Sequence, residues 1–489
     1  MGSSPSLKIF TKQRALYRVL QFMTHDSPQE SGRHDLTTGP IGKLLWQLAW
    51  PMMLSMFFHT LYNIVDAFWV SKLSPQAIAA VSISQITFFL MMALGFGITA
   101  GSGVVMAMDI GAKNKPEAER VLGQSFVLTA IMGAFFTVFA LVFRTQLLTL
   151  SGASGAIFEP ALEYFTVSAM GSLLFFLMIA IMFAFNAQGD TFTLTKLFAV
   201  STLLNGVLDP ILIFGWYGAP ALGIGGAAVA TLLSQAVFIV IALYSLSRPK
   251  RNVPFHFRNL SFQWESVKKV LKIGIPAALT QVINPIGLSA LTIITATAFQ
   301  EPGAVAFSLG FRIEFFAYLP AVGYGFAAMA MMGQSIGAEK LKRAKDILRM
   351  ALMYACGIAL VLGVAIAIFA PQIIAIFTED PTVTSYALQY FRTVALSYVF
   401  LAAMMVEASA FQAVGKSWPG FWIMSVRFLV ITLPLAYVLT FIFDLSIIGV
   451  WIAIIVGNVI AAAIGYIWIW KTLGKFDFTE VEETVHLHA

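Results

Sequence analysis

Apolar runs of about twenty residues recur along the chain from residue 44 to residue 470. Inside a bilayer the backbone amides find no water, so a run of this length crosses as an α-helix. Only 11% of the 489 residues are charged and 59% are hydrophobic, whereas soluble domains carry about 25% charged residues. We therefore expect an all-α integral membrane protein.

Twelve such runs can be counted, which predicts twelve transmembrane helices. The predicted spans are 44–70, 78–106, 121–143, 161–184, 191–214, 222–245, 270–298, 303–330, 347–370, 387–411, 420–442 and 447–470. The fourth span is separated from the fifth by the turn-like residues 186–190.

The loops between these runs alternate in charge. Those after the second, sixth and eighth runs carry several lysines and arginines, among them Lys113, Arg251 and Lys342, while the intervening loops are nearly free of them. Positively charged loops stay in the cytoplasm, so both termini are expected there. The prediction is a multi-pass protein of the cell (inner or plasma) membrane.

The two halves of the chain resemble each other. IGA at 110–112 recurs at 336–338, and FNAQGDT at 185–191 recurs as FQAVGKS at 411–417. Six spans per copy give both copies the same orientation, so they are expected to form two pseudo-symmetric six-helix lobes around a central cavity. The predicted organisation is a cytoplasmic tail at 1–42, an N-lobe at 43–246, a cytoplasmic linker at 247–269, a C-lobe at 270–471 and a cytoplasmic tail at 472–489.

Two aspartates fall inside the predicted spans of the first half. A carboxylate in hydrocarbon costs roughly 2.5–3.5 kcal/mol and usually serves a function. Asp66 and Asp209 lie near the outer ends of the first and fifth spans, at similar depth. Asn205 is one turn below Asp209, Tyr62 is one turn below Asp66, and Thr231 of the sixth span can reach the same level. These residues predict a polar pocket in the N-lobe.

Two prolines accompany these acids. Proline lacks an N–H, so Pro51 and Pro210 leave the carbonyls of Gln47 and Gly206 without helical partners and are candidate bend points. The pocket then offers carboxylate, amide, hydroxyl and carbonyl oxygens, which suit sodium. A proton fits equally well, because two desolvated acids close together cannot both ionise cheaply. The coupling ion is left as H+ or Na+, and no other cofactor is expected.

The second half keeps the prolines but not the acids. Leu433 precedes Pro434 where Asp209 precedes Pro210, and the position of Asp66 corresponds to Leu291 or Thr292. If the acids served folding alone, both lobes would be expected to carry them. Their restriction to one lobe favours a functional role.

The second half carries other charges within its spans. Arg312 and Glu314 lie in the eighth span, and Glu407 and Arg427 lie toward the inner ends of the tenth and eleventh. Buried charges of opposite sign tend to pair, so structural pairing is the favoured interpretation. A substrate-facing role for Glu314 or Glu407 is the alternative.

Several short motifs are shared with a known family. They are WP and YNIVD in the first span, GAKNKPEAERV, FNAQGD, NGVLDP and GAAVAT in the first half, and RIEFFAYLPAVGYG, IGAEK and FQAVGKS in the second. In this order, from about residue 43 to 471, the chain resembles the multidrug and toxic compound extrusion (MATE) family, and within it the DNA-damage-inducible-protein-like branch. The resemblance implies a V-shaped central cavity and export of organic compounds by proton or sodium antiport.

The resemblance also implies site residues. Carried over onto this sequence, the N-lobe ion site comprises Asp66, Asn205, Asp209 and Thr231, with Tyr62 close by and Pro51 as a bend point. Another branch of the family has acids on the seventh and tenth spans, where this chain has Asn284 and residues around Ala403. The resemblance to that branch therefore does not extend to a C-lobe ion site.

The sequence bears on three classes of function. A secondary multidrug exporter accounts for the buried acids. A flippase for a lipid-linked substrate would need several cations facing the cavity, and the mid-membrane cations are chiefly Arg312 and Arg427. A membrane enzyme is not expected, because no aspartate-rich pair, His–Glu–x–x–His or nucleotide loop occurs. The expected partners are small organic substrates and the lipid bilayer, with no nucleic acid, and the chain is expected to be a monomer.

Overall fold

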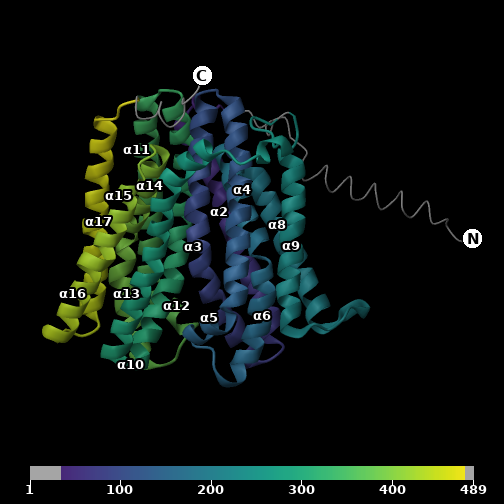
Figure 1. Ribbon diagram of the computed structural model, residues 1–489. Helices are drawn as coiled ribbons and strands as arrows, with labels where there is room; N and C mark the ends of the chain where they lie inside the picture. Colours follow the sequence, from purple (N-terminus) through teal and green to yellow (C-terminus); the bar gives the residue numbers. More distant parts are fainter. Residues whose placement is uncertain (1–34, 250, 479–489) are drawn as a thin grey trace, which may run out of the picture.

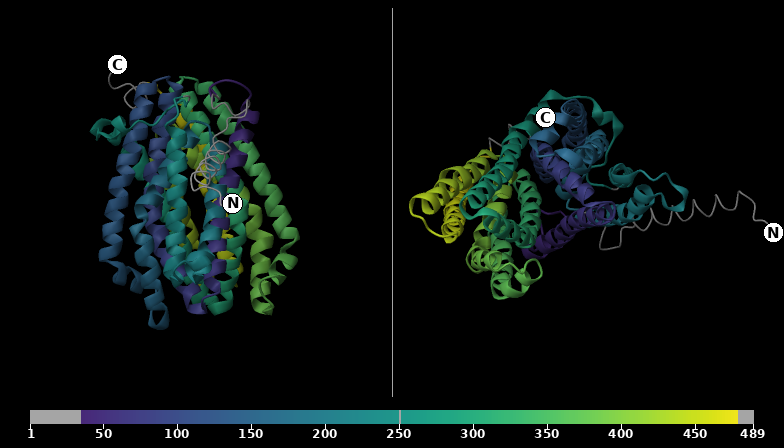
Figure 2. Two further views of the ribbon diagram at one scale, coloured as in Figure 1. Left: turned by 90° about the vertical axis from the view of Figure 1, so that its right-hand side faces the viewer. Right: turned by 90° about the horizontal axis from the view of Figure 1, so that it is seen from below.

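The computed structural model describes residues 35–249 and 251–478, except for the side chains of 89–91. Within these residues every regular element is helical, and the long helices run side by side in one bundle (Figures 1 and 2). This confirms the all-α membrane class. The predicted tails at 1–42 and 472–489 lie mostly outside the described residues.

The helices of the first half, together called the N-lobe, are α2 (Ile41–Ser71), α3 (Pro75–Gly111), α4 (Lys115–Val142), α5 (Arg144–Leu150), η1 (Gly155–Ile157), α6 (Phe158–Met170), α7 (Ser172–Ala187), α8 (Thr191–Phe214), η2 (Trp216–Gly218) and α9 (Gly223–Leu246). After η3 (Phe257–Leu260), the helices of the C-lobe are α10 (Trp264–Gly337), α11 (Leu341–Ile368), α12 (Ala370–Ala375), α13 (Pro381–Thr393), η4 (Val394–Ser397), α14 (Tyr398–Ala413), α15 (Trp418–Ser425), η5 (Val426–Thr432), α16 (Leu433–Tyr437), η6 (Val438–Ile442) and α17 (Ile448–Gly474).

Every predicted span falls on one helix or on consecutive helices. In the described ranges, nine helices are long and apolar enough to cross a membrane, or ten if the bent pair α6 and α7 forms one span. The 74-residue α10 carries both the seventh and the eighth predicted spans and breaks only at Gln300 (φ 55°, ψ −154°). It begins at Trp264, inside the predicted linker, because the helix continues past the apolar run into charged residues.

Side-chain caps set several helix starts. A capping oxygen accepts a backbone N–H that the first turn of a helix leaves free. The capping residues are Ser74 for α3, Asn114 for α4, Asp190 for α8 and Asp380 for α13. The turn-like 186–190 segment therefore ends one span and starts the next, as predicted.

The backbone repeats itself in the two halves. Lys113 and Glu339, which follow the two IGA copies, both adopt left-handed conformations, with φ of 59° and 57°. Gly189 and Gly415, in the second pair of matching segments, have φ of 75° and 76°. Left-handed residues other than glycine are uncommon, so their recurrence shows that the sequence repeat is a structural repeat.

The basic loops gather at one end of the bundle, at the top of Figure 1, which is called the basic end. Lys340 donates to the Thr37 carbonyl at 3.0 Å. Arg251 of the linker forms an ion pair with Asp190. Arg343 donates to backbone carbonyls in the segment that precedes α2. These contacts join the segment before α2 to the C-lobe, and the linker to the start of α8, at this end.

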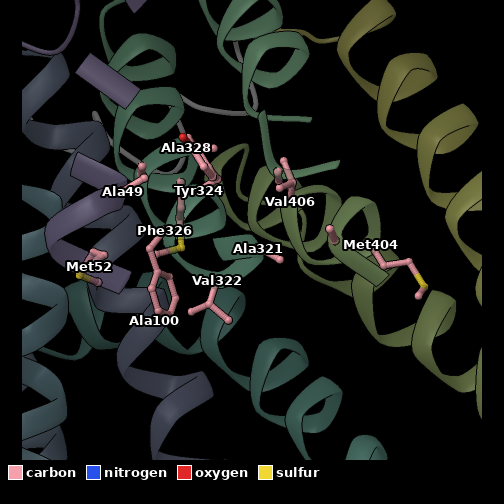
Figure 3. Packing of buried hydrophobic residues seen from close by; sticks show 14 of the residues in the cluster. Ala49, Met52, Ala100, Ala321, Val322, Tyr324, Phe326, Ala328, Met404 and Val406 are labelled. Atoms are coloured by element: carbon pink, nitrogen blue, oxygen red, sulfur yellow. The ribbon is translucent and has the colours of Figure 1, made fainter. Parts of the chain in front are cut away.

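The two lobes pack closely in the half of the bundle nearer the basic end. A Cβ atom at Gly97 of α3 would overlap backbone atoms of Ala278 on α10, and one at Gly337 would overlap the backbone of Met108. Small residues allow such backbone approach inside membranes. Beside this contact, Ala49, Met52 and Ala100 of the N-lobe lie opposite Val322 and Phe326 of α10 (Figure 3).

Hydrogen bonds add to this closure. Gln334 Nε2 donates to the Ala187 carbonyl at 2.8 Å, and Asn186 Nδ2 donates to the Phe326 carbonyl at 3.2 Å. Lys269 Nζ lies 3.6 Å from Glu117 Oε1. The lobes are therefore held together by specific polar and backbone contacts in the basic half.

Gly97→Ala is expected to force the lobes apart in the basic half, because the added methyl meets backbone rather than a movable side chain. Spin labels on Lys115→Cys and Lys342→Cys, in a background that lacks Cys356, should report a longer and broader distance distribution. Gly357→Ala is the matched control, since nothing lies within 4 Å of its Cβ position. An unchanged distance in Gly97→Ala would contradict this account of the closure.

Candidate functional site

Helices α2 and α8 hold the predicted site between them. Thr195 Oγ1 of α8 donates to the Pro51 carbonyl of α2 at 2.7 Å, and Thr202 Oγ1 donates to the Phe58 carbonyl at 3.1 Å. Further along, Gly206 leaves room for α2 to approach. The two helices are thus in register, so that residues toward their far ends meet.

Asp66 and Asp209 meet in this way. The two residues are 2% and 0% exposed, and Asp66 is a charged neighbour of Asp209. Asn205 Nδ2 donates to Asp209 Oδ1 at 3.0 Å. Asp66 Oδ1 and Asp209 Oδ2 have no hydrogen-bond partner among the described residues. Buried acceptors without partners are costly. The pocket therefore has two carboxylate oxygens that lack a hydrogen-bond donor or a cation.

Hydroxyl groups complete the pocket. Tyr62 of α2 and Thr231 of α9 are neighbours, as their positions predicted. Tyr164 of α6 is buried and lies against Asp66. Sequence reasoning missed Tyr164, because a tyrosine in an apolar span has many ordinary packing roles and nothing local distinguishes this one.

The two prolines lie inside α2 and α8, and both helices continue through them. The Pro51 carbonyl also accepts from Ser55 Oγ at 2.9 Å, in addition to its bond from α8. Pro51 is therefore part of the contact between the two helices. That either proline serves as a bend point stays a prediction.

A third buried aspartate lies beyond the predicted end of the second span. Asp109 is 0% exposed, and neither of its carboxylate oxygens has a partner in the described part of the chain. The sequence predicts that the second span ends at residue 106, whereas α3 continues to Gly111. The charges of Glu117 and Lys269 act on Asp109 from α4 and α10. It belongs to the closed contact between the lobes and not to the pocket.

The C-lobe charges do not pair as expected. Among the ion pairs of the described residues, none joins two of Arg312, Glu314, Glu407 and Arg427. Arg312 is exposed, and Glu314 accepts from the Tyr390 hydroxyl at 2.8 Å. Glu407 is buried with both oxygens unpartnered.

Asn284, the remaining candidate, is half-buried on α10.

The described residues contain no group of three or more His, Cys, Asp and Glu side chains able to hold a metal ion. The N-lobe pocket supplies two carboxylates, an amide and three hydroxyls. Such an all-oxygen set suits either a proton or a hard monovalent cation. Its position inside a bundle of membrane helices allows an ion to be bound away from bulk water.

Two matching lobes of membrane-length helices, with a pair of buried aspartates in one of them, define a polytopic membrane protein with the architecture of a secondary transporter. The MatE family matches residues 51–211 and 276–438, one segment in each lobe. The chain belongs to this family.

Individual relatives cover most of the chain. It is similar to a FAD transporter of Shewanella oneidensis, 27% identical over 83% of this chain and 89% of that protein. A probable multidrug resistance protein, NorM, of Thermotoga maritima is 26% identical over 85% and 89%. A solved outward-facing multidrug resistance MATE family transporter of the MOP superfamily has a TM-score of 0.84 and 29% identity, covering 91% of this chain and 98% of that one.

Asn205→Ala should destabilise the protein by about 1–3 kcal/mol, because it leaves another buried oxygen of Asp209 without a donor. The thermal unfolding of the purified protein measures this loss. Asn63→Ala is the matched control, since Asn63 is exposed and bonds only to its own helix at the His59 carbonyl. Equal stability of the two variants would contradict a role for Asn205 in satisfying Asp209.

Proposed function

We propose that this chain is a secondary active exporter that exchanges organic compounds for H+ or Na+. The observation that carries the proposal is the pair of buried carboxylates, Asp66 and Asp209, each with an oxygen that lacks a partner. Family membership and relatives named as multidrug resistance proteins support it. The N-lobe pocket is proposed to bind the coupling ion.

The contact between α3 and α10 in the basic half defines which side of the transporter is proposed to be closed. If the basic loops are cytoplasmic, as positively charged loops usually are, the contact between α3 and α10 closes the cytoplasmic side. The ion pocket lies beyond that contact, toward the opposite end. The conformation described here is then one that takes up its ion from outside the cell.

Coupling follows from charge. An ion that enters the pocket removes the repulsion between Asp66 and Asp209 and supplies the missing partner of their oxygens. A cationic substrate stabilised by the same negative charge loses its attraction and is released. This coupling is reciprocal, so the substrate weakens ion binding by the same factor.

The substrate class is proposed only as organic compounds. One relative is named for FAD and others for multidrug resistance. Proteoliposomes assayed with FAD and, separately, with a cationic dye distinguish these two possibilities.

Asp66→Asn and Asp209→Asn are each expected to reduce gradient-driven export by about tenfold or more, because a neutral amide cannot exchange charge with the ion. Export is measured in proteoliposomes under an imposed proton gradient or an imposed sodium gradient, each alone. The gradient that drives the unmodified protein identifies the ion. Asp444 lies in an exposed loop at the end of the bundle opposite the basic end, so Asp444→Asn should retain full export. Undiminished export by Asp66→Asn would place the coupling site elsewhere.

Labelling tests the proposed orientation. In a background that lacks Cys356, Lys342→Cys should react with a membrane-impermeant thiol reagent only after the cells are opened, because it lies at the basic end. Asp444→Cys should react in intact cells. The reverse pattern would show that the protein has the opposite orientation in the membrane. The proposed direction of transport would then also be reversed.

A further inference from the structure

A second pocket lies in the C-lobe, among α10, α13, η5 and α17. Its walls are largely apolar, with Leu291, Phe307 and Ile454 buried around it. Arg427 and Glu314 also line it. The proposed ion coupling uses none of these residues.

The repeat relates this pocket to the ion pocket of the N-lobe. Leu291 is at or next to the position that corresponds to Asp66. Tyr390 precedes FQAVGKS by the same number of residues as Tyr164 precedes FNAQGDT. The C-lobe therefore has a pocket in the equivalent place, in which an arginine is present and the two aspartates are absent.

Arg427 is buried, with only 6% of its surface exposed, and its side chain is anchored by neighbouring residues. Its Nε donates to Asn458 Oδ1 at 2.8 Å, and Asn458 Nδ2 in turn donates to Ser397 Oγ at 3.0 Å. Its guanidinium carbon lies 4.4 Å from the ring centre of Phe428. No hydrogen bond from Nη1 or Nη2 occurs within the described residues, so two charged donors remain available.

The acid of this pocket is anchored separately. Tyr390 holds Glu314 Oε2 at 2.8 Å, and Glu314 does not come within the 4.0 Å of Arg427 that defines an ion pair. The two side chains are therefore anchored by different partners and do not form a pair with each other. Thr432 Oγ1 is buried beside them and has no partner in the described part of the chain.

We propose that this pocket binds the carboxylate group of an organic anion, with Arg427 and Thr432 as donors and Glu314 in its neutral form. A planar guanidinium matches the two oxygens of a carboxylate. The Glu314 proton, on the oxygen that Tyr390 does not hold, is donated to the ligand without leaving Glu314. An apolar body attached to the carboxylate would lie toward Phe311, which is 41% exposed and lines the pocket. A cation would be repelled by the fixed charge of Arg427.

The arrangement has a defined pH dependence. The groups acting on Glu314 are Arg427 of η5, Tyr390 of α13, Tyr398 of α14 and Tyr318 of α10. Of these groups only Glu314 can change charge over an ordinary assay pH range, since arginine stays charged and tyrosine neutral. As the pH rises, an ionised Glu314 repels the bound carboxylate. Affinity should therefore fall with rising pH.

Titration calorimetry with benzoate on the full chain in lipid nanodiscs tests the proposal. Benzoate keeps its charge over this pH range. Arg427→Gln should weaken binding by about tenfold or more, since it removes a charged donor pair. Glu314→Gln should bind benzoate with an affinity that no longer depends on pH, because the amide still donates and cannot ionise. Arg312→Gln, an exposed arginine on α10, is the matched control and should bind as the unmodified protein does.

Several outcomes would overturn the proposal. They are absence of benzoate binding to the unmodified protein, equal binding by Arg427→Gln, loss of binding in Glu314→Gln, and an affinity that does not fall as the pH rises. If Arg427→Gln does not fold, Thr432→Val decides: severalfold weaker binding supports the site, and unchanged binding refutes it. The measurement uses no gradient, so its failure would leave the proposed ion coupling untouched.

Discussion

The close approach of α3 to α10 is the contact on which the rest of the structure depends. Glycines such as Gly97 and Gly337 bring the two backbones together with no side chain between them, and packing of this kind replaces the hydrophobic effect inside a bilayer. The backbone contacts at Gly97 and Gly337 lie in the basic half. Asp66 and Asp209 lie toward the opposite end of the N-lobe.

Much of this fold could be predicted from the sequence because hydrocarbon imposes simple rules. Long apolar runs must be helices, and the duplicated segments around Gly189 and Gly415 required two similar halves. Asp66 and Asp209 could be matched in depth because helices in a membrane have known direction and rise.

Other features depended on contacts that no local pattern reveals. Tyr164 reaches Asp66 from a different helix. Asp109 was missed because helices continue beyond the apolar run that marks them. The charges of the C-lobe were expected to pair, but Arg427 is anchored by Asn458 and Glu314 by Tyr390. Such arrangements are decided by tertiary packing, which a periodicity in the sequence does not encode.

The single-residue break at Gln300 has a mechanical consequence. In the N-lobe, residues 72–74 separate α2 from α3, whereas in the C-lobe the two arms of α10 meet at one backbone joint with an uncommon conformation. Such a joint transmits a tilt of one arm directly to the other. Leu291 and Glu314 line the same pocket from opposite arms. A ligand in that pocket would contact both arms of α10. Its binding would therefore be coupled to the angle between the two arms.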